Sequence, residues 1–311
     1  MTVREVAPPS ALFAALGETI VGQRHVLEAL VYALIGDGHV LLEGPPGLAK
    51  TLACRALAAA VAGNFKRVQF TPDLLPSDIV GTRVFDQKTG EFTTVLGPIF
   101  AHVVLADEIN RAPAKVQSAL LECMQEGQVT IGPETHRLPE PFIVMATMNP
   151  LDAEGTYALP LAQMDRFLLK ELVGYPDMEE ELRILERFGG EPRTLQRAVI
   201  SLEHVVQWRH EARQIYVDGR VARYAALLVR ATRAGNPYFE RGASPRATLA
   251  LIALARARAF CEGRSYVLPD DVKAVAPAAL RHRIALNYRV STEGLDPERL
   301  IADVISGVPV P

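Results

Sequence analysis

The sequence predicts an α/β fold, a parallel sheet flanked by helices, followed by an all-helical domain. Three observations predict it. In the first half of the chain, short apolar runs alternate with helical patterns, as in a parallel sheet covered by helices. At residues 44–51, a loop rich in glycine and proline connects one apolar run to a helical stretch. After residue 176, helical patterns follow one another and no strand pattern remains.

The elements of the first half can be placed from their patterns. Apolar runs predict strands at residues 40–42, 67–70, 102–106 and 142–146, with a short fifth strand near 167–169. Helical periodicity predicts helices at residues 24–35, 51–62 and 114–125. Two segments alternate about a turn and predict β-hairpins inserted into the fold, at residues 82–96 and 128–138.

The second half of the chain has only helical patterns. They predict helices at residues 177–188, 202–215, 220–234, 245–260 and 270–280. Their starts are marked by residues typical of N-caps and first turns, namely Asp177, Ser201, Ser244 and the pair Pro269-Asp270. This change of character predicts two domains, residues 1–176 and 177–311.

Composition restricts the class of protein. With 49% hydrophobic and 22% charged residues, the 311-residue chain has the composition of a soluble globular protein large enough for two domains. No apolar run is long enough to span a membrane, and the N-terminus lacks the apolar core of a signal peptide. Three cysteines without metal-ligand spacing indicate free thiols, so we expect a cytoplasmic protein. A net charge of −3 argues against a constitutive nucleic-acid binder.

The loop at residues 44–51 reads Gly-Pro-Pro-Gly-Leu-Ala-Lys-Thr, which fits the phosphate-binding pattern G-x-x-x-x-G-K-[ST] except that Ala49 replaces the last glycine. Backbone N–H groups of such a loop, together with the helix that begins there, form an anion site. Lys50 can neutralise the β- and γ-phosphates, and the hydroxyl of Thr51 can bind Mg²⁺. An ordinary surface turn is the alternative, but the preceding strand and the following helix favour a nucleoside triphosphate site.

Two carboxylates, Asp107 and Glu108, follow the apolar run at residues 102–106. Ligands of open parallel sheets bind at the carboxyl ends of the strands, so we expect both side chains to face the same crevice as the loop. There Asp107 can bind Mg²⁺ through its water shell, and Glu108 can polarise an attacking water molecule. Alternatively, the two form a solvated acidic pair that caps the next helix.

Three further residues are candidates for contact with the phosphates. Asn149 follows the strand predicted at residues 142–146, where its amide can hold the water molecule or the γ-phosphate; it can equally begin an Asn-Pro turn. Arg166 follows a short helical stretch and can serve as an arginine finger. Arg246 stands at the start of a helix in the second domain. Arginines are abundant in this chain, so position alone assigns neither role.

Taken together, the motifs resemble those of MoxR-type AAA+ ATPases, and the resemblance covers nearly the whole chain. Ala49 is similar to what MoxR members carry in the phosphate loop. The segments that carry the resemblance are Ile20-Val21-Gly22-Gln23, the loop at residues 44–51, Thr71-Pro72-Asp73-Leu74-Leu75-Pro76-Ser77-Asp78, Asp107-Glu108-Ile109-Asn110-Arg111-Ala112, Asn149-Pro150, Glu154-Gly155-Thr156-Tyr157 and Asp165-Arg166-Phe167.

The resemblance implies a P-loop AAA+ core with two hairpin inserts, a helical lid domain, and ATP or ADP with Mg²⁺ as ligands. Thr51 and Asp107 would be the metal-binding residues. It implies catalytic roles for Glu108 as water activator, Lys50, Asn149 as sensor 1, Arg166 acting on the nucleotide of a neighbouring subunit, and Arg246 as sensor 2. The implied nucleotide contacts, with Val21 to Gln23 beside the adenine, are Val21, Gly22, Gln23, Gly44, Pro45, Pro46, Gly47, Leu48, Ala49, Lys50, Thr51, Leu52 and Asp107.

The family further implies a ring, expected to be a hexamer, and chaperone-like work with a von Willebrand factor A domain partner in metal-centre insertion or complex maturation. Phe85 and Phe92 of the first hairpin are candidates for gripping a client protein, or they pack on the hairpin face. The client is not identified by the sequence. Alternative functions are a magnesium-chelatase-like motor subunit, a DNA-directed AAA+ ATPase, and a nucleotide-dependent scaffold without useful turnover.

Overall fold

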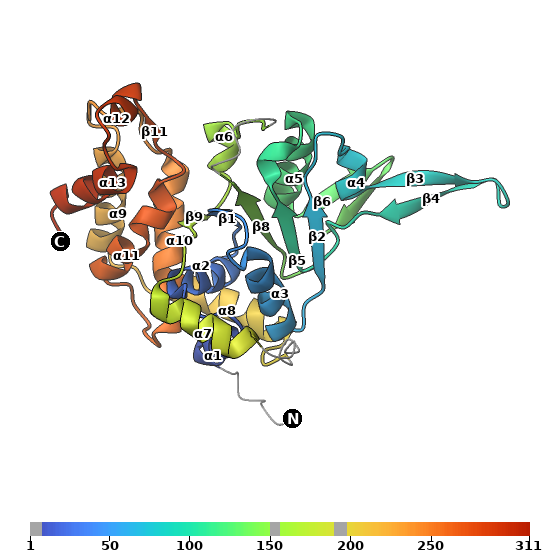
Figure 1. Cartoon of the computed structure of the whole chain (residues 1–311), viewed down its shortest axis with the longest axis horizontal. Helices are drawn as coiled ribbons and strands as arrows, with labels where there is room; N and C mark the ends of the chain where they lie inside the picture. Colours follow the sequence, from blue (N-terminus) through green and yellow to red (C-terminus); the bar gives the residue numbers. More distant parts are fainter. Residues whose placement is uncertain (1–7, 150–155, 190–197) are drawn as a thin grey trace. The chain divides into compact units, whose positions relative to one another are not determined.

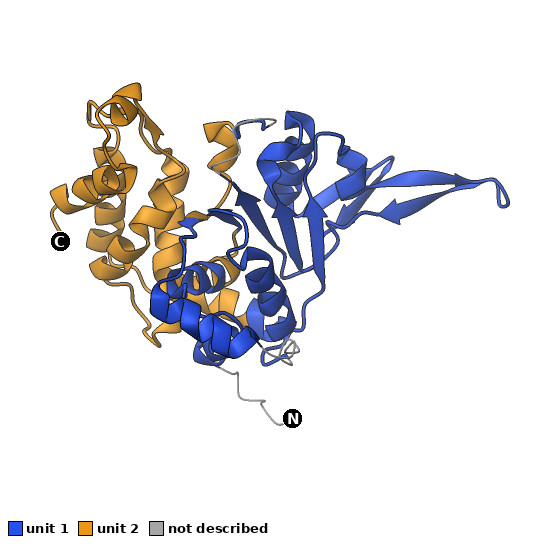
Figure 2. Cartoon of the chain, in the orientation of Figure 1, with its two compact units in different colours: residues 1–31, 39–159, 171–206 blue, residues 32–38, 160–170, 207–311 orange. Residues whose placement is uncertain are grey.

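The computed structural model describes residues 8–149, 156–189 and 198–311 (Figure 1). It divides into two compact units, each assembled from separate segments of the chain (Figure 2). The first unit contains residues 1–31, 39–159 and 171–206, and the second contains residues 32–38, 160–170 and 207–311. The predicted α/β class with a following helical region is confirmed.

A five-stranded sheet, ordered β2-β5-β8-β1-β9, forms the centre of the first unit. Strands β1, β5 and β8 are almost entirely apolar and buried, as expected for strands that are covered on both faces. The pairs β2–β5, β5–β8 and β1–β8 are parallel. The strands are β1 (Val40–Glu43), β2 (Phe65–Gln69), β5 (Val103–Asp107), β8 (Ile143–Met148) and β9 (Leu169–Leu172).

The register of the sheet brings the carboxyl ends of its strands together. Gln69 at the end of β2 is paired with Asp107 at the end of β5. On β8, Thr147 is paired with Leu42 and Met148 with Glu43, the last residue of β1 before the glycine-proline loop. Because parallel strands end at one edge of a sheet, the loop and the two carboxylates share that edge.

Helices and two hairpins complete the first unit. Both predicted hairpins are present, and in Figure 1 the β3–β4 hairpin projects away from the sheet. Sequence patterns did not predict the first helix or the short helix α4. The elements are α1 (Pro9–Thr19), α2 (Arg24–Ile35), α3 (Lys50–Ala60), α4 (Pro76–Val80), β3 (Gly81–Asp86), β4 (Glu91–Leu96), a 3-10 helix (Ile109–Arg111), α5 (Ala114–Glu126), β6 (Gln128–Ile131), β7 (Glu134–Arg137) and α7 (Met178–Phe188). Residues 32–35 at the end of α2 are assigned to the second unit.

The second unit is mainly helical, but the expectation that no strand follows residue 176 is wrong. Strands β10 and β11 form a small antiparallel pair. They are three and two residues long, too short for a recognisable alternation. The elements are α6 (Leu161–Met164), α8 (Leu202–Gln214), α9 (Gly219–Ala231), β10 (Phe239–Arg241), α10 (Pro245–Cys261), α11 (Pro269–Leu280), β11 (Ala285–Leu286), α12 (Tyr288–Thr292) and α13 (Pro297–Gly307). Residues 202–206 at the start of α8 are assigned to the first unit.

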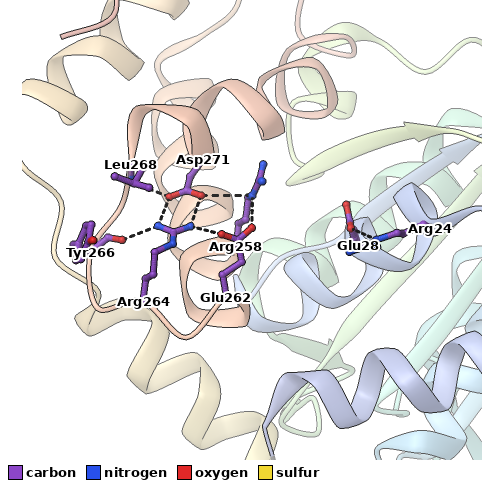
Figure 3. Close-up of polar contacts among 8 residues, drawn as sticks. All are labelled: Arg24, Glu28, Arg258, Glu262, Arg264, Tyr266, Leu268 and Asp271. Carbon is purple, nitrogen blue, oxygen red and sulfur yellow. Dashed lines mark hydrogen bonds and ion pairs between the residues drawn. The ribbon is translucent and has the colours of Figure 1, made fainter.

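A buried carboxylate fixes the connection between α10 and α11. Asp271 is 2% exposed and accepts hydrogen bonds of 2.6 and 2.8 Å from the guanidinium of Arg264 and one of 2.8 Å from the N–H of Leu268 (Figure 3). Arg264 also donates to Glu262. A buried charge needs such compensation, so this cluster stabilises the start of α11.

The compact units do not coincide with the two domains predicted from sequence. Helix α7 belongs to the first unit, where Arg187 donates hydrogen bonds to the backbone oxygens of Gly17 and Glu18. Residues 160–170 belong to the second unit although they precede residue 176. A change in sequence pattern marks one point in the chain, whereas packing assembles segments that are distant in sequence. The domain boundary near residue 176 remains a prediction.

Candidate active site

The glycine-proline loop connects β1 directly to α3, which begins at Lys50. Gly47 has a φ of +83°, and Ala49, the N-cap of α3, is also left-handed with a φ of 54°. That conformation costs an alanine roughly 1–2 kcal/mol, a cost that glycine would avoid. At Gly44, a Cβ atom would collide with the backbone oxygen of Val173. The loop is therefore held in a specific tight conformation.

Lys50 lies beside both candidate carboxylates. Its ammonium donates a hydrogen bond to the backbone oxygen of Gly44. Burial lowers the pKa of Lys50, and the negative charges of Asp107, Glu108 and Glu43 oppose that shift. A half-buried cation next to carboxylates fits a role in binding a polyanion, because it supplies charge where water is partly excluded.

Thr147, a residue that sequence analysis did not select, holds the carboxylate of Asp107 and the backbone of Glu108. The buried hydroxyl of Thr147 donates to Asp107 Oδ1 at 2.6 Å and accepts the backbone N–H of Glu108 at 2.8 Å. Glu108 has a left-handed backbone with a φ of 57°, which is uncommon outside glycine. The chain therefore turns sharply at Glu108 and directs consecutive residues to different positions.

Arg67 and Gln69 of β2 also contact the carboxylates, and sequence analysis missed them too. Arg67 donates to Asp107 Oδ2 at 2.7 and 3.0 Å and to Gln69 Oε1 at 2.7 Å. Gln69 in turn donates to Glu108 Oε2 at 2.9 Å, and Arg111 pairs with the same oxygen at 3.0 Å. Arg67 and Gln69 are two residues apart at the end of a strand, so they share one face of the sheet, and this spacing was the available signal.

A cavity of about 440 Å³ brings the candidate residues together. It lies within the first unit. Its lining contains the predicted residues Lys50, Thr51, Asp107, Glu108 and Asn149. The lining residues are Pro46, Gly47, Leu48, Ala49, Lys50, Thr51, Leu52, Arg67, Gln69, Asp107, Glu108, Thr147 and Asn149.

Other predicted site residues lie elsewhere. Among the described residues, Val21, Gly22, Gln23, Gly44 and Pro45 are outside the cavity lining. Pro150, Glu154 and Gly155, which carry part of the family resemblance but were not predicted as site residues, are outside the residues that the structure describes.

Both predicted arginines belong to the second unit. Arg166 lies just after α6, and Arg246 lies in the first turn of α10. Both side chains are exposed.

The donor set fits Mg²⁺ bound together with a phosphate. Thr51 and Asp107 both line the cavity and offer a hydroxyl and a carboxylate oxygen. Within the described ranges, no group of three or more His, Cys, Asp or Glu side chains forms a metal site. Mg²⁺ needs no such group, because it commonly uses one or two protein oxygens, water molecules and the phosphates of its substrate.

Comparisons with known proteins agree with this geometry. The family model "ATPase family associated with various cellular activities (AAA)" matches residues 39–169, and the "AAA lid domain" model matches residues 230–304. The chain is 48% identical to "Chaperone MoxR1" of Mycobacterium tuberculosis, over 94% of this chain and 79% of that protein. It is 43% identical to "Uncharacterized protein YeaC" of Bacillus subtilis, over 95% of this chain and 92% of that protein.

Two further comparisons extend the match. The chain is 30% identical to "Protein MoxR" of Methylorubrum extorquens, over 95% of this chain and 93% of that protein. The crystal structure of a Cytophaga hutchinsonii protein superposes with a TM-score of 0.90 at 43% identity, covering 97% of this chain and 94% of that one. In the part of the chain that the structure describes, no helix combines the length and apolar composition that crossing a membrane requires.

Proposed function

Because the chain belongs to the MoxR family of AAA+ ATPases, we propose that its cavity binds ATP with Mg²⁺ and hydrolyses it to ADP and phosphate. The observation that carries this proposal is the convergence of Lys50, Asp107 and Glu108 on one cavity beside the phosphate loop. A cation for the phosphates, a metal-binding carboxylate and a second carboxylate for water are the parts that hydrolysis requires.

The loop and its helix would hold the triphosphate. Residues 44–52 would contribute to binding the phosphates, the start of α3 would supply its positive helix end, and Lys50 would neutralise their charge. Thr51 and Asp107 would hold Mg²⁺, which supplies further positive charge to the phosphates when bound. Val21, Gly22 and Gln23 would contact the adenine.

Glu108 would activate the attacking water molecule as a general base, and Asn149 would orient that water or the γ-phosphate. The support for this assignment is the separate fixing of the two carboxylates. Asp107 is held by Thr147 and Arg67, whereas Glu108 is held by Gln69 and Arg111. Separate partners allow one carboxylate to bind metal while its neighbour accepts a proton.

Arg246 would stabilise the negative charge of the transferred phosphoryl group in its own subunit. Arg166 would do the same for the nucleotide of the neighbouring subunit in a ring, which is expected to be a hexamer. An arginine supplied in this way typically raises the rate about 10³–10⁵-fold. The roles proposed for Arg166 and Arg246 are supported by the exposure of both side chains. Among the described residues, neither guanidinium makes a hydrogen bond or an ion pair. Hydrolysis should then depend on protein concentration through assembly.

We further propose that the ring remodels or matures partner protein complexes, including metal-centre insertion, together with a von Willebrand factor A domain protein. AAA+ ATPases generally form rings, and the relative named "Chaperone MoxR1" supports a chaperone-like role. On the projecting hairpin, Phe85 and Phe92 are 50% and 57% exposed, with ring centroids 5.1 Å apart. That exposed aromatic pair supports a contact with the client.

The test is Glu108→Gln, compared with the matched control Glu126→Gln on the exposed end of α5. We expect Glu108→Gln to retain ATP binding by calorimetry and to lose phosphate release by a factor of about 10²–10⁴, since an amide cannot accept the proton. The control should behave like the parent. Undiminished phosphate release by Glu108→Gln would remove Glu108 as the base, and a parent without phosphate release would favour a nucleotide-dependent scaffold.

A further inference from the structure

Two exposed arginines of the second unit, Arg166 and Arg246, are connected by a short chain of hydrogen bonds. Arg166 directly follows Asp165 in the turn after α6, and Arg246 lies two residues after Ser244, the N-cap of α10. The hydroxyl of Ser244 accepts the backbone N–H of Arg246 at 3.1 Å and donates to Asp165 Oδ2 at 2.8 Å. Only two hydrogen bonds therefore separate the backbones that carry the two arginines.

A third arginine, Arg283, fixes the turn that carries Arg166. The side chain of Arg283 is 3% exposed, and its guanidinium donates to Asp165 Oδ1 at 2.8 Å. The same guanidinium donates to the backbone oxygens of Asp165, Phe167 and Leu168. It therefore holds the backbone on both sides of Arg166, so this turn cannot shift without breaking several charge-assisted hydrogen bonds.

The three arginines differ in whether their guanidinium groups are hydrogen-bonded within the protein. Arg283 uses its donors inside the protein, and burial lowers its pKa while Asp165 raises it. The positive charge of Arg246 also lowers the pKa of Arg283, which places Arg246 within electrostatic reach of this cluster. Arg166 and Arg246 combine a fixed backbone with a free charged end, as expected of residues that reach for a ligand.

We propose that Asp165 and Ser244 are positioning residues that couple Arg166 to Arg246, so that a phosphate contact made by one arginine changes the phosphate affinity of the other. This rests on the proposed roles of Arg246 at the nucleotide of its own subunit and of Arg166 at the neighbouring nucleotide. Coupling between binding sites is reciprocal. The coupling would therefore act equally in both directions between the two arginines.

The coupling is measured by a double-mutant cycle on the assembled protein. Equilibrium binding of the fluorescent analogue mant-ADP is compared among the parent, Arg166→Ala, Arg246→Ala and the double variant. We expect the loss of affinity in the double variant to differ from the product of the single losses by about fivefold or more.

The cycle is then repeated in Ser244→Asp and Ser244→Thr backgrounds. Aspartate still caps α10, but it cannot donate to Asp165 and its charge repels that carboxylate. We expect the coupling factor to fall below about twofold with Ser244→Asp and to persist with Ser244→Thr, which keeps the hydroxyl. A purely structural Ser244 would change the free energy of unfolding in thermal denaturation but leave the coupling factor unaltered.

The outcomes separate this inference from the proposed function. The coupling is refuted if the losses of mant-ADP affinity are additive in the parent background, or if the coupling factor is the same in the Ser244→Asp background. In either case, a loss of affinity in each single variant would still support contacts of both arginines with the nucleotide. If neither single variant weakens mant-ADP binding or phosphate release in a ring confirmed by its mass, the proposed roles of the arginines are wrong.

Discussion

Two arginine–aspartate pairs of this protein have the same chemistry and different surroundings. Arg67 and Asp107 meet at the cavity of the first unit, with 50% and 14% of their side chains exposed. Arg283 and Asp165 meet in the second unit, where Arg283 is 3% exposed and also binds three backbone oxygens of the adjoining turn. The first pair can exchange partners with water or ligand at low cost, whereas the second is a permanent part of the fold.

The largest effect should come from the buried pair. Arg283→Met removes the guanidinium, leaving Asp165 and several backbone oxygens without their partner. We expect the free energy of unfolding to fall by about 3–5 kcal/mol, measured by urea denaturation. A loss under about 1 kcal/mol would show that the pair is no more important to stability than a surface ion pair.

His282, next to Arg283, should make stability depend on pH. Its side chain is buried, with Nε2 3.1 Å from the backbone oxygen of Phe167 and, among the described residues, no partner at Nδ1. Burial, assisted by the charge of Arg283, lowers the pKa of His282 well below its usual value. Below about pH 6.5 the unfolded chain therefore binds a proton that the folded chain does not, and stability falls as the pH decreases.

The measurement compares the parent with His282→Gln, which keeps an N–H donor and does not titrate in this range. From pH 7.5 to 5.5, the parent should lose stability relative to the variant by at most about 1.4 kcal/mol per pH unit. A difference between the two proteins that stays constant over this range contradicts a neutral buried His282.

The smallest effect should come from the cavity pair. Arg67→Met makes the same chemical change as Arg283→Met, but at a half-exposed site. We expect it to lower the free energy of unfolding by less than about 1 kcal/mol in the same urea experiment. A loss as large as that of Arg283→Met would abolish the distinction between the two pairs.

Strand patterns were sufficient to predict which end of the sheet carries the cavity lined by Asp107 and Asn149. Apolar runs that end in Asp107 and in Asn149 place both residues at the carboxyl edge, and no knowledge of strand order is needed for that step. The partners Arg67 and Gln69 depend on β2 lying next to β5, which a single sequence does not reveal. Their contacts with residues about 40 positions away follow from this neighbourhood alone.

The second unit contains a contact between still more distant residues, which the sequence patterns also did not predict. Ser244 was predicted as a helix start, and it does cap α10. Its bond to Asp165 joins residues 79 positions apart, and no periodicity or capping rule contains that information. Asp165 directly precedes the predicted Arg166, but its partners Ser244 and Arg283 are determined by tertiary packing. Local chemistry could be predicted, but the pairing of distant segments could not.

Residues 160–170 belong to a unit most of which is encoded much later in the chain. The carboxylate of Asp165 leaves the ribosome 118 residues before its partner Arg283. At the usual 5–20 residues per second, this delay lasts about 6–24 s. During that time the acidic turn has no guanidinium to hold it, so the hydrogen bonds that fix this turn form only after Arg283 has been synthesised. A truncated product lacking the last thirty or so residues would keep the glycine-proline loop but lose the guanidinium that holds the turn at Arg166.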